Sequence, residues 1–131
     1  QLDLILGNLL RMKCDMSKRY PELLIQDMIQ AIEDLNQCVK DITFETFAQN
    51  REKINACCFA VQVLGEASSK VSEELQAKAL DIPWKQIRAY RNRIVHEYFE
   101  INYDMLWEIS TIHAPLLLNP LKDVLGSLRE H

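Results

Sequence analysis

Residues 22–41 read ELLIQDMIQAIEDLNQCVKD and decide the fold class of this chain. Their apolar side chains recur at steps of three and four residues, which places them along one stripe of an α-helix. The stripe consists of Ile25, Met28, Ile29, Ile32, Leu35 and Val39. Proline is tolerated in the first turn of a helix, so Pro21 favours a helix start at this point. The pattern predicts a helix from about Glu22 to Asp41, with one face buried.

The same spacing continues further along the chain. A second stripe predicts a long helix over about residues 50–79, and its members are Ile54, Cys57, Cys58, Val61, Leu64, Ala67, Ser68 and Val71. Glycine in the middle of a helix costs about 1 kcal/mol relative to alanine, so Gly65 indicates that a neighbouring helix packs closely there. Pro83 and Trp84 predict the start of a third helix, which carries Ile87, Tyr90, Ile94 and Val95.

The remaining segments are also helical in pattern. Residues 2–17 predict an additional N-terminal helix, because Leu2, Ile5, Leu6, Leu9 and Leu10 lie at helical spacing. The chain is expected to turn near Asn102 and then to re-enter a helix. Pro115 predicts the start, or a kink, of a last helix that runs to about Arg129. No strand pattern or linker is found, so the prediction is a single all-α domain over residues 1–131, a mostly antiparallel bundle of four to five helices.

Composition narrows the class of protein. A chain of 131 residues is long enough to bury a core, and its 48% hydrophobic fraction is ordinary for a globular domain. The formal net charge of −4 argues against a general nucleic-acid coat protein. No apolar run approaches the roughly 20 residues of a membrane span. The first ten residues lack a basic region and include Asp3, so no signal peptide is predicted.

The four cysteines do not have the spacing of a disulfide framework, a zinc knuckle or a redox motif. Cys57 and Cys58 are adjacent, and Cys14 and Cys38 stand far from them in sequence. We expect all four to be small core or near-core residues in a reducing cytoplasm. No metal or cofactor is expected from this pattern.

Residues 91–98, RNRIVHEY, carry the functional signal. Arginine offers a fixed fork of donors that suits phosphate oxygens, and histidine moves protons near neutral pH. An arginine and a histidine are in general sufficient to cleave RNA without a metal, which makes Arg91 and His96 candidates for that chemistry. Residues 85–96 contain no acidic side chain and four cations, which are Lys85, Arg88, Arg91 and Arg93. A basic island on an acidic body fits a defined phosphate site, although a solvated helix face with a half-buried histidine gives the same pattern.

The spacing of the motif constrains its geometry. On a straight helix Arg91 and His96 diverge by about 140°, whereas Asn92, His96 and Arg88 share a face. Either the helix ends near His96 or the groups converge across a symmetric dimer. In a two-fold dimer two basic islands and two histidines would meet in one cleft. Such a cleft would be locally basic and could bind a nucleic acid despite the negative net charge of the chain.

The chain resembles HepT-type toxins of the HEPN superfamily over about residues 20–125. The resemblance rests on four blocks, which are Val63-Leu64-Gly65-Glu66-Ala67, Ile82-Pro83-Trp84-Lys85-Gln86-Ile87, Arg91-Asn92-Arg93-Ile94-Val95-His96-Glu97-Tyr98-Phe99 and Trp107-Glu108-Ile109. The arginine, four intervening residues, the histidine, one residue and the tyrosine match the family signature without a gap. Residues 1–19 lie outside this core and are expected to form an N-terminal extension helix.

The resemblance implies an all-α homodimer with a metal-independent endoribonuclease site in the dimer cleft. It also implies an antitoxin partner, a nucleotidyltransferase of the MntA type, that silences the toxin by attaching AMP to the motif tyrosine. Carried over to this chain, Arg91 and His96 are the catalytic pair, Asn92 supports them and Tyr98 is the AMPylation site. A modified Tyr98 would place bulk and negative charge where RNA must bind.

Other residues have simpler interpretations. Lys85, Arg88 and Arg93 are expected to bind substrate phosphates, and Trp84 and Trp107 are expected to anchor the core. Glu66 either orients an arginine of the motif or is an ordinary helical carboxylate.

Three classes of function remain open at this point. They are the endoribonuclease toxin, a non-catalytic HEPN module that binds a nucleotidyltransferase partner or a nucleotide phosphate, and a structural dimer with no ligand. The last class leaves the acid-free basic window unexplained.

Overall fold

The computed structural model describes residues 2–95 and 100–130, with the side chains of residues 7–19 excepted. The described part is helical, and its only strand-like feature is an isolated bridge between Val95 and Ile101. The elements in chain order are α1 (Leu2–Val39), α2 (Phe44–Ala48), α3 (Arg51–Lys70), α4 (Glu73–Lys78), α5 (Trp84–Ile94), α6 (Tyr103–Glu108), the π-helical turn η2 (Ile109–His113) and α7 (Ala114–Arg129). The all-α prediction is confirmed.

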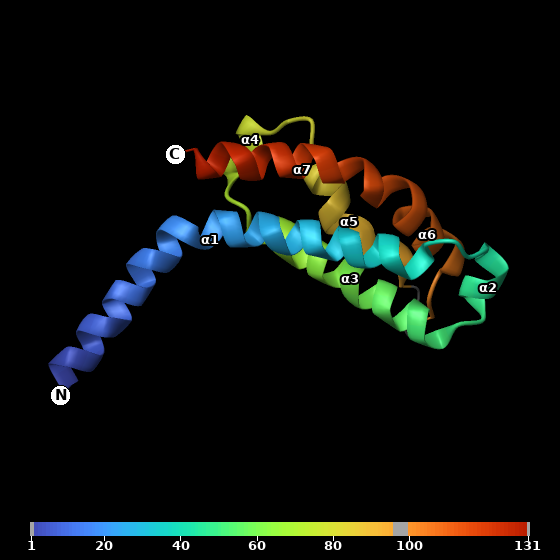
Figure 1. Cartoon of the computed structure of the whole chain (residues 1–131), viewed down its shortest axis with the longest axis horizontal. Coiled ribbons are helices and arrows are strands. Elements are labelled where there is room, and N and C mark those ends of the chain that lie inside the picture. The colour runs from blue at the N-terminus through green and yellow to red at the C-terminus, as the bar shows by residue number, and fades with distance from the viewer. Residues whose placement is uncertain (1, 96–99, 131) are drawn as a thin grey trace.

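The long helices run antiparallel to their neighbours (Figure 1). Helix α3 packs against α1 and against α5, while α7 packs against the other side of α1. One apolar core fills the space between them, and its largest fully buried side chains are Phe47, Ile25, Met28, Ile32, Leu35, Leu64, Ile82, Ile87, Ile94, Leu106, Ile109 and Leu121. The predicted stripes of residues 22–41 and 50–71 therefore face the core.

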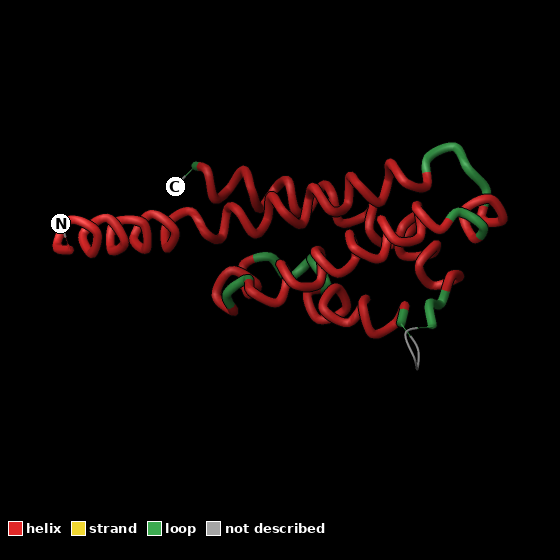
Figure 2. The backbone as a smooth tube through the Cα atoms, turned by 90° about the horizontal axis from the view of Figure 1, so that it is seen from below, coloured by secondary structure: helices red, strands yellow, loops and turns green. Residues whose placement is uncertain are grey.

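Helix α1 is longer than the sequence pattern predicts. The expected N-terminal helix and the helix over residues 22–41 form one element, Leu2–Val39, and Pro21 lies inside it rather than in its first turn. Proline removes one backbone donor from a helix and bends it, which the flanking turns tolerate. In Figure 1 the axis of α1 changes direction between its deep-blue and light-blue parts. The N-terminal part projects beyond the bundle (Figures 1 and 2).

The prediction of one continuous helix over residues 50–79 is wrong after Lys70. Helix α3 ends at Lys70, Val71 has an extended backbone, and α4 begins after Ser72. The Ser72 hydroxyl accepts a hydrogen bond from the Leu75 N–H at 3.2 Å, which caps the new helix. Val71 is buried at the turn. Its apolar side chain therefore fits the helical spacing of the stripe, although the helix has already ended.

The short helix α2 is not predicted by the apolar pattern. Thr43 caps it through its hydroxyl, which accepts from the Thr46 N–H at 3.2 Å. Its two phenylalanines, Phe44 and Phe47, pack against Trp107 with ring centroids 5.9 and 5.2 Å away. Trp107 is half-buried against the core, as expected of an anchor.

The described cysteines fit the prediction of small residues in or near the core. Cys57 is buried, whereas Cys38 and Cys58 are half-buried. Burial, reinforced by the neighbouring Cys38, raises the pKa of the Cys57 thiol to about 12. A protonated thiol is a poor nucleophile, so this position serves packing rather than chemistry. The side chain of Cys14 lies outside the described residues.

No helix in the described ranges combines the length and the apolar character needed to cross a membrane.

Gly65 lies against the backbone of α5, which confirms the predicted close approach of a helix. A methyl group built at Gly65 would stand 3.5 Å from the Ile87 carbonyl oxygen and 3.9 Å from that of Arg88. Those separations are ordinary contacts, so an alanine fits and a larger side chain does not. Gly126 in α7 has nothing within 4 Å of the same position and provides a matched control.

We expect Gly65→Ala to raise the free energy of unfolding by up to about 1 kcal/mol, because alanine is the better helix former. Gly65→Val should lower it by about 1–3 kcal/mol, because the branched side chain presses on backbone carbonyls that cannot rotate away. Urea titrations of both variants and of Gly126→Ala and Gly126→Val measure this. Equal tolerance of valine at the two glycines would contradict the close packing of α5 on α3.

Candidate functional site

The start of α5 is held by a tryptophan. Trp84 is buried, and its indole N–H donates to the Ala79 carbonyl oxygen at 3.0 Å. The Trp84 backbone N–H donates to the Ile82 carbonyl at 2.9 Å, which closes the turn before the helix. Trp84 therefore fixes both the position and the rotation of α5, and the prediction that it anchors the core is confirmed.

The rotation of α5 separates an apolar face from a basic one. Ile87, Tyr90 and Ile94 are buried against the bundle. The opposite side exposes Lys85, Arg88, Arg91, Asn92 and Arg93, which together are called the α5 basic face. At about 100° per residue, Lys85, Arg88 and Asn92 lie along one line, with Arg91 and Arg93 on its two edges. The structure thus brings five of the sequence-predicted site residues onto one exposed surface.

Contacts along the α5 basic face are few. The Arg88 guanidinium donates to the side-chain oxygen of Gln76 at 3.2 Å, which ties it to α4. Ion pairs found among the described residues join other parts of the molecule, namely α4 within itself, η2 to α6, and α7 to α1. The cations of this face are therefore not neutralised by a described carboxylate.

The cations in the last turn of α5 lie where the helix dipole favours positive charge. Arg91 and Arg93 lie at the C-terminal end of the helix, where the backbone dipole is negative and favours cations. Burial raises the pKa of the Tyr90 phenol, while the nearby Arg93 acts in the opposite direction. Tyr90 therefore stays neutral near physiological pH and packs as an apolar ring.

Helix α5 ends at Ile94, inside the motif. The Val95 N–H donates to the Arg91 carbonyl at 3.2 Å, and Val95 then pairs with Ile101 in the isolated bridge. The Asn102 N–H donates to the Ile94 carbonyl at 2.7 Å, so residues 94–95 and 101–102 are joined. The prediction that the helix ends near His96 is thus supported. His96 and Tyr98 themselves lie outside the described residues, and their assigned roles remain predictions.

Asn102 has a second role at this junction. Its side-chain oxygen accepts a hydrogen bond from the Met105 N–H at 3.0 Å and so caps α6. One residue therefore holds the end of α5 through its backbone and the start of α6 through its side chain.

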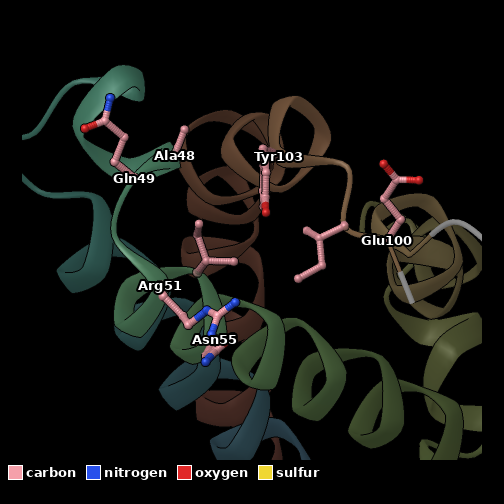
Figure 3. A pocket seen from close by; sticks show the side chains of 8 residues that line it. Ala48, Gln49, Arg51, Asn55, Glu100 and Tyr103 are labelled. Atoms are coloured by element: carbon pink, nitrogen blue, oxygen red, sulfur yellow. The ribbon is translucent and has the colours of Figure 1, made fainter. Parts of the chain in front are cut away.

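A hollow of about 530 Å³ lies beside this junction, and no sequence pattern predicts it. We call it the corner hollow, because it is bounded by the corner between α2 and α3 and by the segment that enters α6. It is lined by Ala48, Gln49, Arg51, Ile54, Asn55, Glu100, Ile101 and Tyr103. Figure 3 shows the Tyr103 ring pointing into it above Arg51 and Asn55, with Glu100 at the far edge.

No ion pair between Glu66 and α5 is found among the described residues. Glu66 lines a different hollow between α1 and α3 together with Tyr20, Asp27 and Phe59. None of the ion pairs in the described part of the chain includes it, which leaves the interpretation as an ordinary helical carboxylate. The described residues also contain no group of three or more histidine, cysteine or acidic side chains that could hold a metal ion.

The described part of the chain is thus a helical bundle with an exposed basic face on α5. The family model described as Ribonuclease HepT-like matches residues 28–124, so the chain belongs to the HepT-like family of the HEPN superfamily. The predicted family resemblance is confirmed.

Named relatives agree with the family assignment. A Caldanaerobacter subterraneus subsp. tengcongensis protein with a provisional RNase name is 31% identical over 105 residues, covering 80% of this chain and 94% of the relative. A similarly named protein of Methanocaldococcus jannaschii is 33% identical over 100 residues, covering 76% and 92%. A Thermococcus cleftensis protein provisionally named ribonuclease HepT is 28% identical over 100 residues, covering 76% and 91%. No solved structure matches the chain significantly.

We expect Asn102→Ala to loosen the junction between α5 and α6. Loss of the cap costs about 1 kcal/mol, so the backbone amide at position 102 should exchange its hydrogen about fivefold faster in this variant. Hydrogen exchange followed by NMR measures this. Ser72→Ala removes an equivalent cap from α4 and should leave exchange at position 102 unchanged. Equal exchange at this position in both variants would show that the side chain of Asn102 does not hold the junction.

Proposed function

We propose that this chain is the toxin of a toxin–antitoxin pair and acts as a metal-independent endoribonuclease. The observation that carries the proposal is membership of the HepT-like family over residues 28–124, a range that contains all of α5. The names of the relatives refer to ribonucleases. An RNA substrate also gives a reason for a helix that exposes cations and no carboxylate on an otherwise acidic chain.

The chemistry uses the RNA's own 2′-hydroxyl as the nucleophile. His96 takes the proton of this hydroxyl as its oxygen forms a bond to the neighbouring phosphorus. The bond from phosphorus to the 5′-oxygen then breaks, and that oxygen receives a proton from a second histidine of the dimer. Arg91 neutralises the charge that develops on the phosphorane oxygens. The products are a 2′,3′-cyclic phosphate and a free 5′-hydroxyl.

The remaining residues of the α5 basic face support this step. Asn92 stands next to Arg91 and shares the exposed side of the helix, where it can orient the catalytic pair. Lys85, Arg88 and Arg93 bind phosphates on either side of the scissile bond. Because these contacts are to the backbone of the nucleic acid, they position the strand without reading its sequence.

A homodimer completes the site in this proposal. Helix α5 ends at Ile94, before His96 is reached in the sequence, and a two-fold axis near the end of α5 would bring two basic faces into one cleft. Helices α1 and α3, which pack against each other, also carry large exposed apolar side chains. Leu23 on α1 is 48% exposed and Phe59 on α3 is 70% exposed, and α3 contacts both α1 and α5.

We expect the protein to be a dimer in solution and Phe59→Asp to weaken the dimer by about 30-fold or more, the effect of losing an interface hot spot. Light scattering should show that the Phe59→Asp variant is a monomer at micromolar concentration. Its RNA cleavage should fall in proportion to the fraction that remains dimeric. The fold should persist, since the Phe59 side chain is 70% exposed. Leu80→Asp changes a leucine that is 83% exposed on another surface and should remain dimeric. A strictly monomeric parent that cleaves RNA would remove the composite-site proposal.

Substitution of the catalytic pair tests the reaction. His96→Ala and Arg91→Ala should each lower cleavage by about 10²–10⁴-fold, the usual contribution of a positioned acid, base or charge-stabilising group. Lys122→Ala on α7 serves as a control for the loss of one surface cation. EDTA should not inhibit the parent, and mass spectrometry should identify cyclic phosphate ends. Cleavage that survives in His96→Ala, or that needs added magnesium, would favour the non-catalytic HEPN module that binds a nucleotidyltransferase partner or a nucleotide phosphate.

Control of the toxin is proposed to act through Tyr98. Incubation with its MntA-type nucleotidyltransferase antitoxin, ATP and magnesium should add mass in AMP units to Tyr98 and lower RNA cleavage, because the modification adds bulk and negative charge at the cleft. Tyr98→Phe removes the phenolic nucleophile and should escape this silencing. Tyr103→Phe is the matched control and should be silenced like the parent. Modification mapped to another residue would remove Tyr98 from the proposal and leave the nuclease assignment intact.

A further inference from the structure

The corner hollow is connected to the motif through the backbone. Arg91 bonds through its carbonyl to the Val95 N–H, and Val95 pairs with Ile101, which lines the hollow. The end of α5, which carries Arg91, is therefore joined through Val95 to one wall of this hollow. This adjacency is not required by the catalytic pair and is a separate feature of the fold.

The lining of the hollow combines three kinds of surface. Ile54, which is 5% exposed, and half-buried Ile101 provide an apolar floor. Tyr103, which is 44% exposed, points its ring into the hollow (Figure 3). The Arg51 guanidinium and the Asn55 amide stand on the opposite side. The volume of about 530 Å³ lies within the range of small-ligand pockets.

The charged side chains that line the hollow differ in sign between its two sides. Arg51 is the first residue of the 20-residue helix α3, whose N-terminal dipole adds to the positive potential there. Within the described ranges the Arg51 guanidinium forms no ion pair. Glu100 lies at the far edge of the hollow. An anion is therefore attracted to the α3 side, and groups that donate hydrogen bonds are favoured on the Glu100 side.

We propose that the corner hollow, beside the junction that follows α5, is a nucleotide-binding subsite for single-stranded RNA. Tyr103 stacks on an unpaired base, Arg51 binds the adjoining phosphate, and Asn55 donates to or accepts from the base edge. Unpaired bases stacked on aromatic rings beside an arginine are the usual mode by which proteins bind single-stranded RNA. The assignment rests on the proposed ribonuclease function for its substrate, and its residues are separate from the catalytic pair.

The test uses binding rather than cleavage as its readout. All variants are made in the full chain that also carries His96→Ala, and a fluorescent ten-nucleotide RNA without secondary structure is titrated by anisotropy. Tyr103→Ala should weaken binding by about 5- to 150-fold, the range expected for loss of one base stack. Tyr103→Phe should bind within about twofold of the parent, because the ring is kept. Tyr103→Leu should bind like the alanine variant, since apolar area alone does not replace stacking.

Salt dependence separates the role of Arg51 from that of Tyr103. Removal of one phosphate contact to a single strand should reduce the slope of log affinity against log salt by about 0.7. Arg51→Ala should show this reduction, whereas Tyr103→Ala should weaken binding with no change of slope. Lys122→Ala, which removes an exposed cation from α7, should change neither quantity.

The outcomes distinguish this proposal from the ribonuclease proposal. If the chain with an intact His96 cleaves RNA but the Tyr103→Ala and Arg51→Ala variants bind like their parent, the subsite is wrong and the nuclease assignment stands. If RNA binds with the expected pattern but the intact chain does not cleave it, the subsite stands without catalysis. Loss of nucleotidyltransferase binding in the Tyr103→Ala variant with unchanged RNA binding would assign the hollow to the protein partner and overturn the RNA subsite.

Discussion

The packing of α5 on α3 is the contact on which the placement of the site depends. Gly65 lets the α5 backbone lie against α3, and the Trp84 indole bonded to Ala79 fixes how α5 is rotated there. These two constraints, one steric and one a buried hydrogen bond, turn the cations of α5 outward. The basic face is therefore a consequence of one helix–helix contact. The last turn of α5 is joined through Val95 to Ile101, which lines the corner hollow.

Much of the fold was predictable because its signals are local. The stripe from Ile25 to Leu35, the proline before Trp84 and the turn at Asn102 each act within a few residues. The break after Lys70 was not predictable in this way, because a buried Val71 continues the apolar stripe whether the helix goes on or turns inward. Pro21 was misplaced for a related reason, since a proline in a first turn and a proline inside a long helix have the same flanking sequence.

The candidate site also has one part that local sequence patterns predict and one part that they do not. The arrangement of Lys85, Arg88 and Asn92 on one face follows from helical geometry alone, and so could be predicted as soon as the helix was recognised. The corner hollow could not, because Arg51 and Tyr103 are far apart in sequence and only the packing of two helix starts brings them together. Both helices begin with an asparagine cap, at Asn50 and Asn102. Such caps mark where helices start but carry no information about which starts are neighbours.

The ion pair between Arg129 and Glu22 has a consequence for how the molecule can be attached to others. The Arg129 guanidinium lies 2.7 Å from the Glu22 carboxylate, which pins the end of α7 to α1. In Figure 1 that end and the α6 region lie at opposite ends of the bundle. A fluorophore, an affinity handle or a second domain joined after α7 would thus emerge far from the α5–α6 junction. Such a fusion can immobilise or track the protein while access of a long polyanion to the other end stays open.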